Sequence, residues 1–221
     1  MFVRLWMSRD PIALLPSQTV AEAASLMRER RIRHLPVVDV DKKLIGIVSA
    51  YDIADIQPPA AANASDRAAH LGQQTALSLL PVERIMSRQP ISASPLTPIE
   101  TVAQQMRRHK LGGMPVVDED GKLIGVFTES DLCSACMTML GGGGGTRVDL
   151  LFAKEGRRVL VDILNLCQRH GVTVLACVLH RNYSDSQQLL TLRLIGDGLT
   201  DLLADLPGAG AAIYQLLEEE A

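Results

Sequence analysis

The hydrophobic pattern of this chain switches between two periods, and the same order of periods occurs twice. In each copy, one set of apolar residues recurs with helical spacing; these are Val20, Ala23, Ala24 and Met27, then Ile99, Val102, Ala103 and Met106. Two short apolar runs follow, at 35–38 and 44–48 in the first copy, and they predict two strands joined by the polar turn 39–43. A second helix is expected after Ser49 and after Thr128.

Short signals also mark the beginning of the first helix in each copy. Residues 12–15 and 91–93 predict an extended segment before it. Thr19 with Glu22 fits a capping box, in which each side chain accepts a hydrogen bond from a free backbone N–H. Thr97 with Glu100 fits the same pattern, and Pro98 suits the first helical position. Both first helices are therefore expected to begin with a capping box.

The two copies align without a gap. Met7 pairs with Met86 and Asp52 with Asp131, both at an offset of 79 (86 − 7 and 131 − 52). Between them, "LPVVDVDKKLIGIVSAYDI" recurs as "MPVVDEDGKLIGVFTESDL". One unit of this length buries too little surface to be stable alone. We therefore expect the copies to share a core around a pseudo-twofold axis.

The last third of the chain predicts a separate small domain. Five consecutive glycines at 141–145 have a high ordering cost inside a helix or strand and predict a flexible linker. The pattern behind it predicts the order β-α-β-β-α-β; the elements are expected at 148–152, 156–170, 172–179, 189–195, 198–206 and 213–217. The apolar side of its first helix is expected to consist of Val159, Leu160, Ile163, Leu164 and Cys167.

Composition argues against several partners. The formal net charge of −3 gives no general attraction to nucleic acid or to an anionic membrane, so neither partner is expected. No stretch approaches the roughly 18 to 20 apolar residues of a membrane span, and residues 1–11 lack the apolar core of a signal peptide. The four cysteines, Cys133, Cys136, Cys167 and Cys177, fit reduced thiols. A cytoplasmic protein is therefore expected.

Catalytic and metal-binding patterns are not expected either. Cys133 and Cys136 have the spacing of a zinc or redox pair, but they form a single pair inside a predicted helix. No Walker loop, dinucleotide fingerprint or catalytic triad is recognisable. The chain is expected not to be an enzyme, to hold no metal and to require no cofactor.

The chemistry is concentrated in a duplicated motif, Gly-x-x-Ser/Thr-x-x-Asp. Its residues are Gly46, Ser49 and Asp52, then Gly125, Thr128 and Asp131. The start of a helix carries backbone N–H groups that suit a phosphate, and a carboxylate one turn later can accept both hydroxyls of a ribose. The same pattern caps many helices for stability alone. The motif by itself therefore leaves both roles open.

These residues resemble the CBS motif, and the pair resembles a Bateman module. The resemblance rests on the two Met-Ser-Arg starts, on "RHLPVVD" and "LGGMPVVD", and on "GIVSAYD" and "GVFTESD". It implies an α/β (α+β) fold with CBS motifs at 1–56 and 81–140 and a linker at 57–80. The tail at 146–221, behind the glycine linker 141–145, resembles a ferredoxin-like ACT-type βαββαβ domain. The whole order resembles the AcuB family of acetoin-utilisation proteins.

By this resemblance, an adenine nucleotide (AMP, ADP, ATP or S-adenosylmethionine) binds between the motifs as a regulatory ligand. One pocket is expected to combine residues of both motifs; these are Thr128 and Asp131 with Ile12, Arg33, His34 and Pro36. The other pocket is expected to combine Ser49 and Asp52 with Ile91, Gly112, Gly113 and Pro115. Only the first offers the cation Arg33 and the titratable His34, so it is expected to hold a phosphorylated nucleoside more tightly.

Three functions stay open at this point. The leading one is a ligand sensor that acts on an unidentified protein partner, with a link to acetoin or carbon metabolism. The others are a receptor for c-di-AMP and an oligomerisation module without a ligand. A homodimer is expected in each case, because one pair of motifs is not expected to bury all four of the residues Val20, Met27, Val102 and Met106. The ACT-like tail would add a second sensor or a dimer surface.

Overall fold

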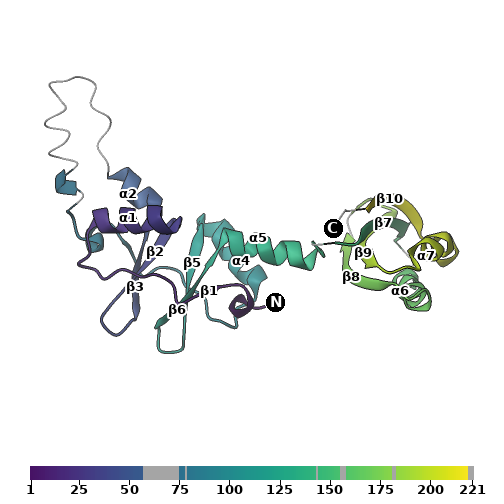
Figure 1. Cartoon of the computed structure of the whole chain (residues 1–221), viewed down its shortest axis with the longest axis horizontal. Coiled ribbons are helices and arrows are strands. Elements are labelled where there is room, and N and C mark those ends of the chain that lie inside the picture. Colours follow the sequence, from purple (N-terminus) through teal and green to yellow (C-terminus); the bar gives the residue numbers. More distant parts are fainter. Residues whose placement is uncertain (57–74, 78, 143, 155–157, 181–182, 219–221) are drawn as a thin grey trace, which may run out of the picture. The chain divides into compact units, whose positions relative to one another are not determined.

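The computed structural model describes the chain except residues 57–74, 78, 143, 155–157, 181–182 and 219–221. The chain divides into two compact units, Met1–Cys133 and Ser134–Ala221, and the expected α/β (α+β) class is confirmed (Figure 1). Most of the predicted linker 57–80 lies outside the described residues. The boundary between the two units falls inside the helix α5 (Glu129–Met139). The flexible linker expected at 141–145 stays a prediction.

The N-terminal unit contains the same series of elements twice. The first series is η1 (Val3–Leu5), β1 (Ser8–Arg9), α1 (Val20–Arg30), β2 (His34–Val38), β3 (Leu44–Ser49) and α2 (Ala50–Asp55). The second is η2 (Val82–Arg84), β4 (Ser87–Arg88), α4 (Ile99–His109), β5 (Gly113–Val117), β6 (Leu123–Thr128) and α5. The repeat in the sequence is therefore a repeat in the structure; we call residues 7–53 the first repeat and residues 86–132 the second.

Each repeat contributes its first short strand to the sheet of the other repeat. β1 pairs with β6, which gives the order β1-β6-β5, and β4 pairs with β3, which gives the order β2-β3-β4. Separating the repeats would remove one strand from each sheet. This exchange accounts for the pairing that the short repeat length predicts.

Gly46 and Gly125 make room for this exchange. A Cβ atom on Gly46 would lie 2.5 Å from Sδ of Met86, and one on Gly125 would lie 2.8 Å from Sδ of Met7. Each glycine thus accommodates the methionine that begins the other repeat. The glycine of the duplicated motif has a packing role in both copies.

A pseudo-twofold axis passes between Lys43 and Lys122. These equivalent residues (122 − 43 = 79) form an isolated antiparallel bridge. On either side, the N–H of Leu44 donates to the carbonyl of Gly121 at 3.1 Å, and the N–H of Leu123 donates to the carbonyl of Lys42 at 3.0 Å. The two repeats therefore meet symmetrically at their turns.

The predicted capping box is present on α1 and absent from α4. Thr19 and Glu22 exchange the expected bonds, with the Thr19 N–H donating to Glu22 Oε2 at 2.7 Å. On α4 the prediction was wrong, because the N-cap is Pro98 and makes no side-chain bond. Thr97 instead accepts the N–H of Ser94 at 3.0 Å. Pro98 is the equivalent of Thr19 (98 − 19 = 79), so the helix begins one residue later than predicted.

The apolar faces of α1 and α4 are buried inside the N-terminal unit. Val20, Met27, Val102 and Met106 are 4%, 7%, 0% and 4% exposed. The expectation that one pair of repeats could not bury them all was wrong. Val82, which begins η2 just before the second repeat, packs in the same core as Val20 and Met27. These faces therefore give no support for a homodimer.

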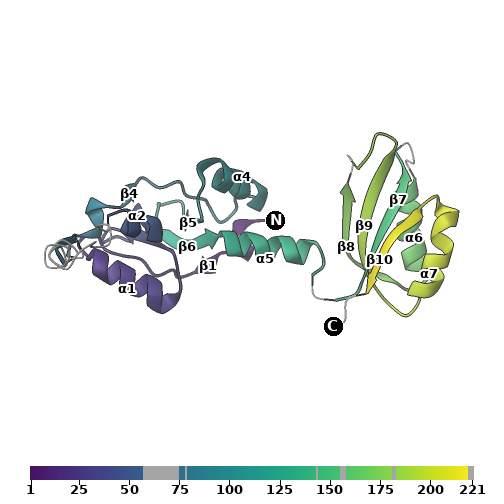
Figure 2. The ribbon, with the colours of Figure 1, turned by 90° about the horizontal axis from the view of Figure 1, so that it is seen from above.

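The C-terminal unit is a four-stranded antiparallel sheet with both of its α-helices on one face (Figure 2). Its elements are β7 (Thr146–Ala153), α6 (Val159–Arg169), β8 (Thr173–His180), β9 (Gln187–Ile195), α7 (Leu199–Asp205), η3 (Leu206–Ala209) and β10 (Ala212–Glu218). The strand order is β10-β7-β9-β8. This is the predicted ferredoxin-like topology, whereas the likeness to ACT domains stays a prediction.

Helix α6 packs into the core of the C-terminal unit along one face. α6 buries Ile163, Leu166 and Cys167, which are spaced i, i+3 and i+4. Leu164, which was expected on this face, is 40% exposed, because one position on a helix turns a side chain by about 100°. None of the described helices is long and apolar enough to cross a membrane.

Candidate functional site

The duplicated motif forms a capping box in both repeats. At the start of α2, the N–H and the hydroxyl of Ser49 donate to Oδ2 of Asp52 at 2.6 and 2.7 Å, and the Asp52 N–H donates to Ser49 Oγ at 3.3 Å. At the start of α5, Thr128 and Asp131 make the same three bonds at 2.7, 2.8 and 3.3 Å. The capping role that the sequence left open is therefore present twice.

Capping uses only one oxygen of each carboxylate. Oδ1 of Asp52 and Oδ1 of Asp131 accept no hydrogen bond from any residue that the structure describes. Both aspartates are half-buried, and each is held in place by its N-cap residue. An oriented carboxylate oxygen with free lone pairs can accept a hydroxyl group of a ligand. Capping and ligand binding are therefore compatible at these positions.

The backbone register brings the candidate residues of each repeat together. His34 lies opposite Ser49 in the β2–β3 pair, and Gly113 lies opposite Thr128 in the β5–β6 pair. The carbonyl of Arg33 accepts the N–H of Ala50 at 2.9 Å. The predicted pairing of Thr128 and its aspartate with Arg33 of the other repeat stays a prediction.

The predicted isoleucine segments lie beside the second strand of their own repeats. The N–H of Leu14 donates to the carbonyl of Pro36 at 2.9 Å, and the N–H of Ala93 donates to that of Pro115 at the same distance. Both prolines are buried. Ile12 packs against the core of the first repeat, whereas Ile91 is 39% exposed.

His34 fills the space that Gly112 and Gly113 leave. A Cβ atom on Gly112 would lie 2.7 Å from Cε1 of His34, and one on Gly113 would lie 3.2 Å from its Cγ and Nδ1. His34 and Gly113 are equivalent (113 − 34 = 79), so the pseudo-twofold axis brings them together and only one can carry a ring. The glycine pair, which we expected to give a ligand access to the backbone, also has this packing reason.

The surroundings of His34 favour its neutral form. Burial lowers the pKa of the imidazole below 6.5, and the positive charge of Arg33 lowers it further, while Glu129 and Asp52 act in the opposite direction. Carboxylates of both repeats therefore act on the charge of the ring, Asp52 from the first and Glu129 from the second. We expect it to be uncharged at neutral pH when no ligand is bound.

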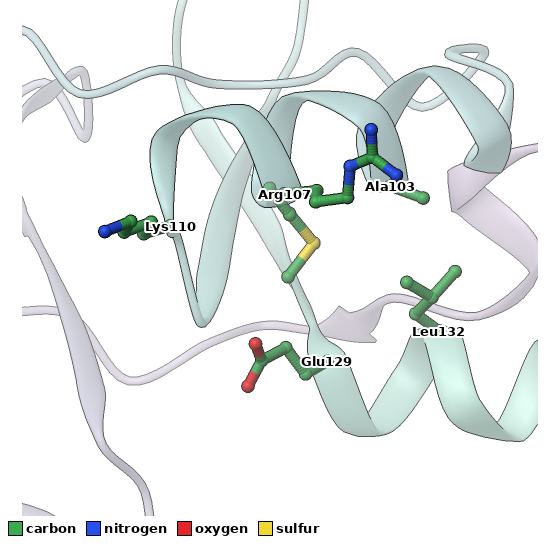
Figure 3. Close-up of a pocket in the computed structure, with 6 residues that line it drawn as sticks. Ala103, Arg107, Lys110, Glu129 and Leu132 are labelled. Carbon is green, nitrogen blue, oxygen red and sulfur yellow. The ribbon is translucent and has the colours of Figure 1, made fainter.

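Glu129 is a candidate that the sequence reasoning missed. It follows Thr128, and its Oε2 lies 3.7 Å from the position of a Cβ atom on Gly112. It also lines a cavity between α4 and α5, together with Ala103, Met106, Arg107, Lys110 and Leu132 (Figure 3). A comparison of the two repeats could have found it, because the equivalent residue is Ala50 (129 − 50 = 79) and the carboxylate therefore occurs in one repeat only.

Cys133 and Cys136 lie on α5 as exposed free thiols. Within the described part of the chain, no group of three histidine, cysteine or acidic residues could hold a metal ion.

Comparison with known proteins gives a consistent picture for the N-terminal unit. A family model described as the CBS domain matches residues 3–58 and 82–138, just over half of the chain. The structure of CBSX2 in complex with AMP is 28% identical with a TM-score of 0.51, and covers 62% of this chain and 96% of that one. The CBS domain pair of protein MJ0100, in complex with 5′-methylthioadenosine and S-adenosyl-L-methionine, is 29% identical with a TM-score of 0.50, over 62% and 95% of the chains.

Two further comparisons also cover only part of this chain. A structure from Vibrio cholerae, assigned to acetoin utilization (AcuB), is 31% identical with a TM-score of 0.52, over 63% of this chain and 93% of that one. L-aspartate semialdehyde sulfurtransferase of Methanocaldococcus jannaschii is 31% identical over 126 residues, which are 57% of this chain and 21% of that protein. The chain spans about a fifth of the length of that enzyme, so the match concerns a part of it.

Proposed function

The chain belongs to the CBS domain family, and from this premise we propose that it is a regulatory protein that binds an adenine nucleotide between its two repeats. The observation that carries the proposal is the duplicated capping box, which orients Asp52 and Asp131 and leaves one oxygen of each carboxylate open. AMP in one similar structure, and S-adenosylmethionine with methylthioadenosine in another, support the choice of ligand class.

In this proposal each aspartate accepts the hydroxyls of a ribose. A phosphate needs a further partner, because two N–H groups at the start of α5 are already used: Glu129 donates to the carbonyl of Gly112 and Asp131 donates to Thr128. Arg33 is exposed and forms no ion pair with any described residue. It is therefore the group that we assign to a ligand phosphate.

The remaining parts of the proposal concern the biological setting. The similarity to the AcuB structure supports a link to acetoin or carbon metabolism. We also propose a homodimer and a second sensing or dimerising role for the C-terminal unit. Its edge strand β10 offers apolar surface for association; the exposed residues are Ile213, Tyr214, Leu216 and Leu217.

A thermal-shift screen tests the function. Purified protein is heated with AMP, ATP, S-adenosylmethionine or c-di-AMP, and a ligand that binds only the folded state raises the melting temperature. We expect a rise with at least one of the first three ligands. A rise with c-di-AMP alone would favour the cyclic dinucleotide receptor. No rise with any of them would leave the aspartates as helix caps in an oligomerisation module.

A further inference from the structure

Strand β10 forms one edge of the sheet in the C-terminal unit, and β8 forms the other (Figure 2). Inside the described part of the chain, β10 pairs with β7 alone, and no other residue forms a backbone hydrogen bond with residues 212–217. The backbone N–H and C=O groups on the outer side of β10 therefore point away from the sheet. An edge of this kind pairs with another strand unless something blocks it.

Large apolar side chains are exposed on both faces of β10. Ile213 and Leu216 are 43% and 41% exposed. They lie opposite Leu150 and Val148, and both of those residues are buried in the core that the helices cover. Leu217 follows Leu216 and therefore points to the other face, where it is 43% exposed. The core thus ends at β7, and β10 extends beyond it with apolar surface on either side.

Apart from a bulge at Tyr214, β10 has none of the features that usually keep edge strands from pairing. Residues 212–217 contain no charged side chain and no proline. The other edge differs, because Leu175 is the only exposed large hydrophobic residue of β8 and the glycine segment passes beside it. A Cβ atom on Gly145 would lie 3.3 Å from Cδ1 of Leu175. Of the two edges, β10 is therefore the one better suited to association.

A second copy of β10 fits this edge in antiparallel orientation. Three glutamates follow the uncharged stretch, at 218–220. In a parallel pair of identical strands these like charges would lie side by side, which is destabilising. In an antiparallel pair they lie at opposite ends of the junction. A twofold axis between two copies produces the antiparallel arrangement, and the surface is then complementary to itself.

The bulge also limits the register of such a pair. Residues that are opposite each other on neighbouring strands lie on the same face of a sheet. Ile213 and Leu216 both lie on the face that carries the helices, because the residues opposite them on β7 belong to the core. Ala212 and Leu217 are their direct neighbours and lie on the other face. If Ile213 is opposite Leu216 of the second copy, Ala212 is opposite Leu217, and both pairs match.

We propose that two copies of the chain associate through β10, with Ile213 of each copy opposite Leu216 of the other, so that their four-stranded sheets join into one continuous sheet. The backbone groups of the outer edges pair with each other, and the exposed apolar side chains pack across the junction. This inference rests on the homodimer proposed above and names the surface that forms it. It is independent of the nucleotide site.

Hydrogen–deuterium exchange on the full chain tests this pairing, because a backbone amide that donates across an interface exchanges slowly. Leu216→Lys places a charge on the apolar edge. Leu164→Lys on α6 is the matched control, because Leu164 is 40% exposed and Leu216 is 41% exposed. We expect residues 212–217 to exchange about 10-fold faster in Leu216→Lys than in the unmodified chain, and at an unchanged rate in Leu164→Lys. Unchanged exchange in β9 shows that the sheet itself stays folded.

Dilution of the unmodified chain gives a second measurement that needs no substitution. As the dimer dissociates, the amides of 212–217 should exchange faster, because their partners across the junction are lost. The amides of β8 should exchange at the same rate throughout the dilution series. Faster exchange in β8 instead of β10 would place the interface at the other edge and overturn the inference.

Light scattering on the same samples supplies the mass of the particle, and we expect a dimer for the unmodified chain. If the chain is a dimer but residues 212–217 exchange at the same rate in Leu216→Lys, the pairing through β10 is overturned and the homodimer has another interface. If the unmodified chain is a monomer at micromolar concentration, the homodimer and this inference are both refuted, and the edge is free for a strand of another protein. Neither result affects the nucleotide function, which the thermal-shift screen tests separately.

Discussion

The imidazole ring of His34 lies against Gly112, with Cε1 2.7 Å from the place where a Cβ atom of that glycine would stand. The contact joins the two repeats at their pseudo-twofold axis, and together with the contact between His34 and Gly113 it explains why the second repeat has two glycines opposite the His34 ring. Symmetry of the fold here requires asymmetry of the sequence, because two rings cannot occupy the same space.

A methyl group at Gly112 should displace the ring. Gly112→Ala places a Cβ atom in contact with His34, and the side chain can move aside because its far end is the part that clashes. We expect a loss of about 1 kcal/mol in the free energy of unfolding and a rise of the His34 pKa as the ring gains solvent. Urea denaturation and an NMR titration of the ring measure the two effects. In a His34→Ala background the glycine substitution should have almost no effect; an equal loss there would contradict the contact.

The depressed pKa of His34 makes stability depend on pH. Because burial and Arg33 lower the folded-state pKa below 6.5, the unfolded state binds the proton more readily. The contribution of His34 is therefore fully present above pH 6.5 and is lost as the pH falls below that value. Urea denaturation between pH 5 and pH 8 should show a smaller loss on acidification for His34→Gln than for the unmodified chain. Parallel curves for the two proteins would show that the ring is not responsible.

The strand exchange depends on Met86, which packs against Gly46 and is 8% exposed. Met86→Ala should lower the free energy of unfolding by about 2 to 4 kcal/mol, because it leaves a cavity between the repeats. Met139 on α5 is 42% exposed and serves as the control, with an expected change within about 0.5 kcal/mol for Met139→Ala. Chemical denaturation followed by circular dichroism compares them. Equal effects would mean that Met86 does not join the repeats.

The glycine run at 141–145 should be the first site of proteolysis. The structure ties its beginning to the end of α5, since the N–H of Gly142 donates to the carbonyl of Met137 at 2.8 Å. Limited digestion with a protease of broad specificity should release two folded fragments, identified by mass spectrometry. Cleavage elsewhere while this run stays intact would count against a linker there.

The helices and strands of the N-terminal unit were predictable from the sequence because their signals are local and occur twice. The strands, the turn between them and the caps at Ser49 and Thr128 follow from periodicity and from short cap motifs. The cap at Thr97 failed for a local reason, since the next residue is a proline whose backbone takes the N-cap position. The alignment of the repeats predicts this N-cap correctly, because the N-cap Thr19 of the first repeat aligns with Pro98 and not with Thr97.

Other features could not be read from local patterns. The burial of Val20 depends on residues far away in the sequence, since Val82 and Met86 pack in the same core. The contact between His34 and Gly112 likewise depends on the axis. Glu129 was missed because the motif was defined by the residues that the two copies share. Glu129 is a difference between them, since the first copy has Ala50 at the equivalent position.

The central claim, that the two aspartates hold an adenine nucleotide, is tested most directly by calorimetry on Asp52→Asn and Asp131→Asn. Asparagine keeps an oxygen that can accept the capping bonds, so the helix starts should survive while the charge that binds the ribose is lost. We predict that the unmodified chain binds AMP or S-adenosylmethionine, that each variant weakens one site by about 10-fold or more, and that the double variant binds neither. Unchanged affinities in the double variant, with its melting temperature preserved, would show that the aspartates only cap their helices.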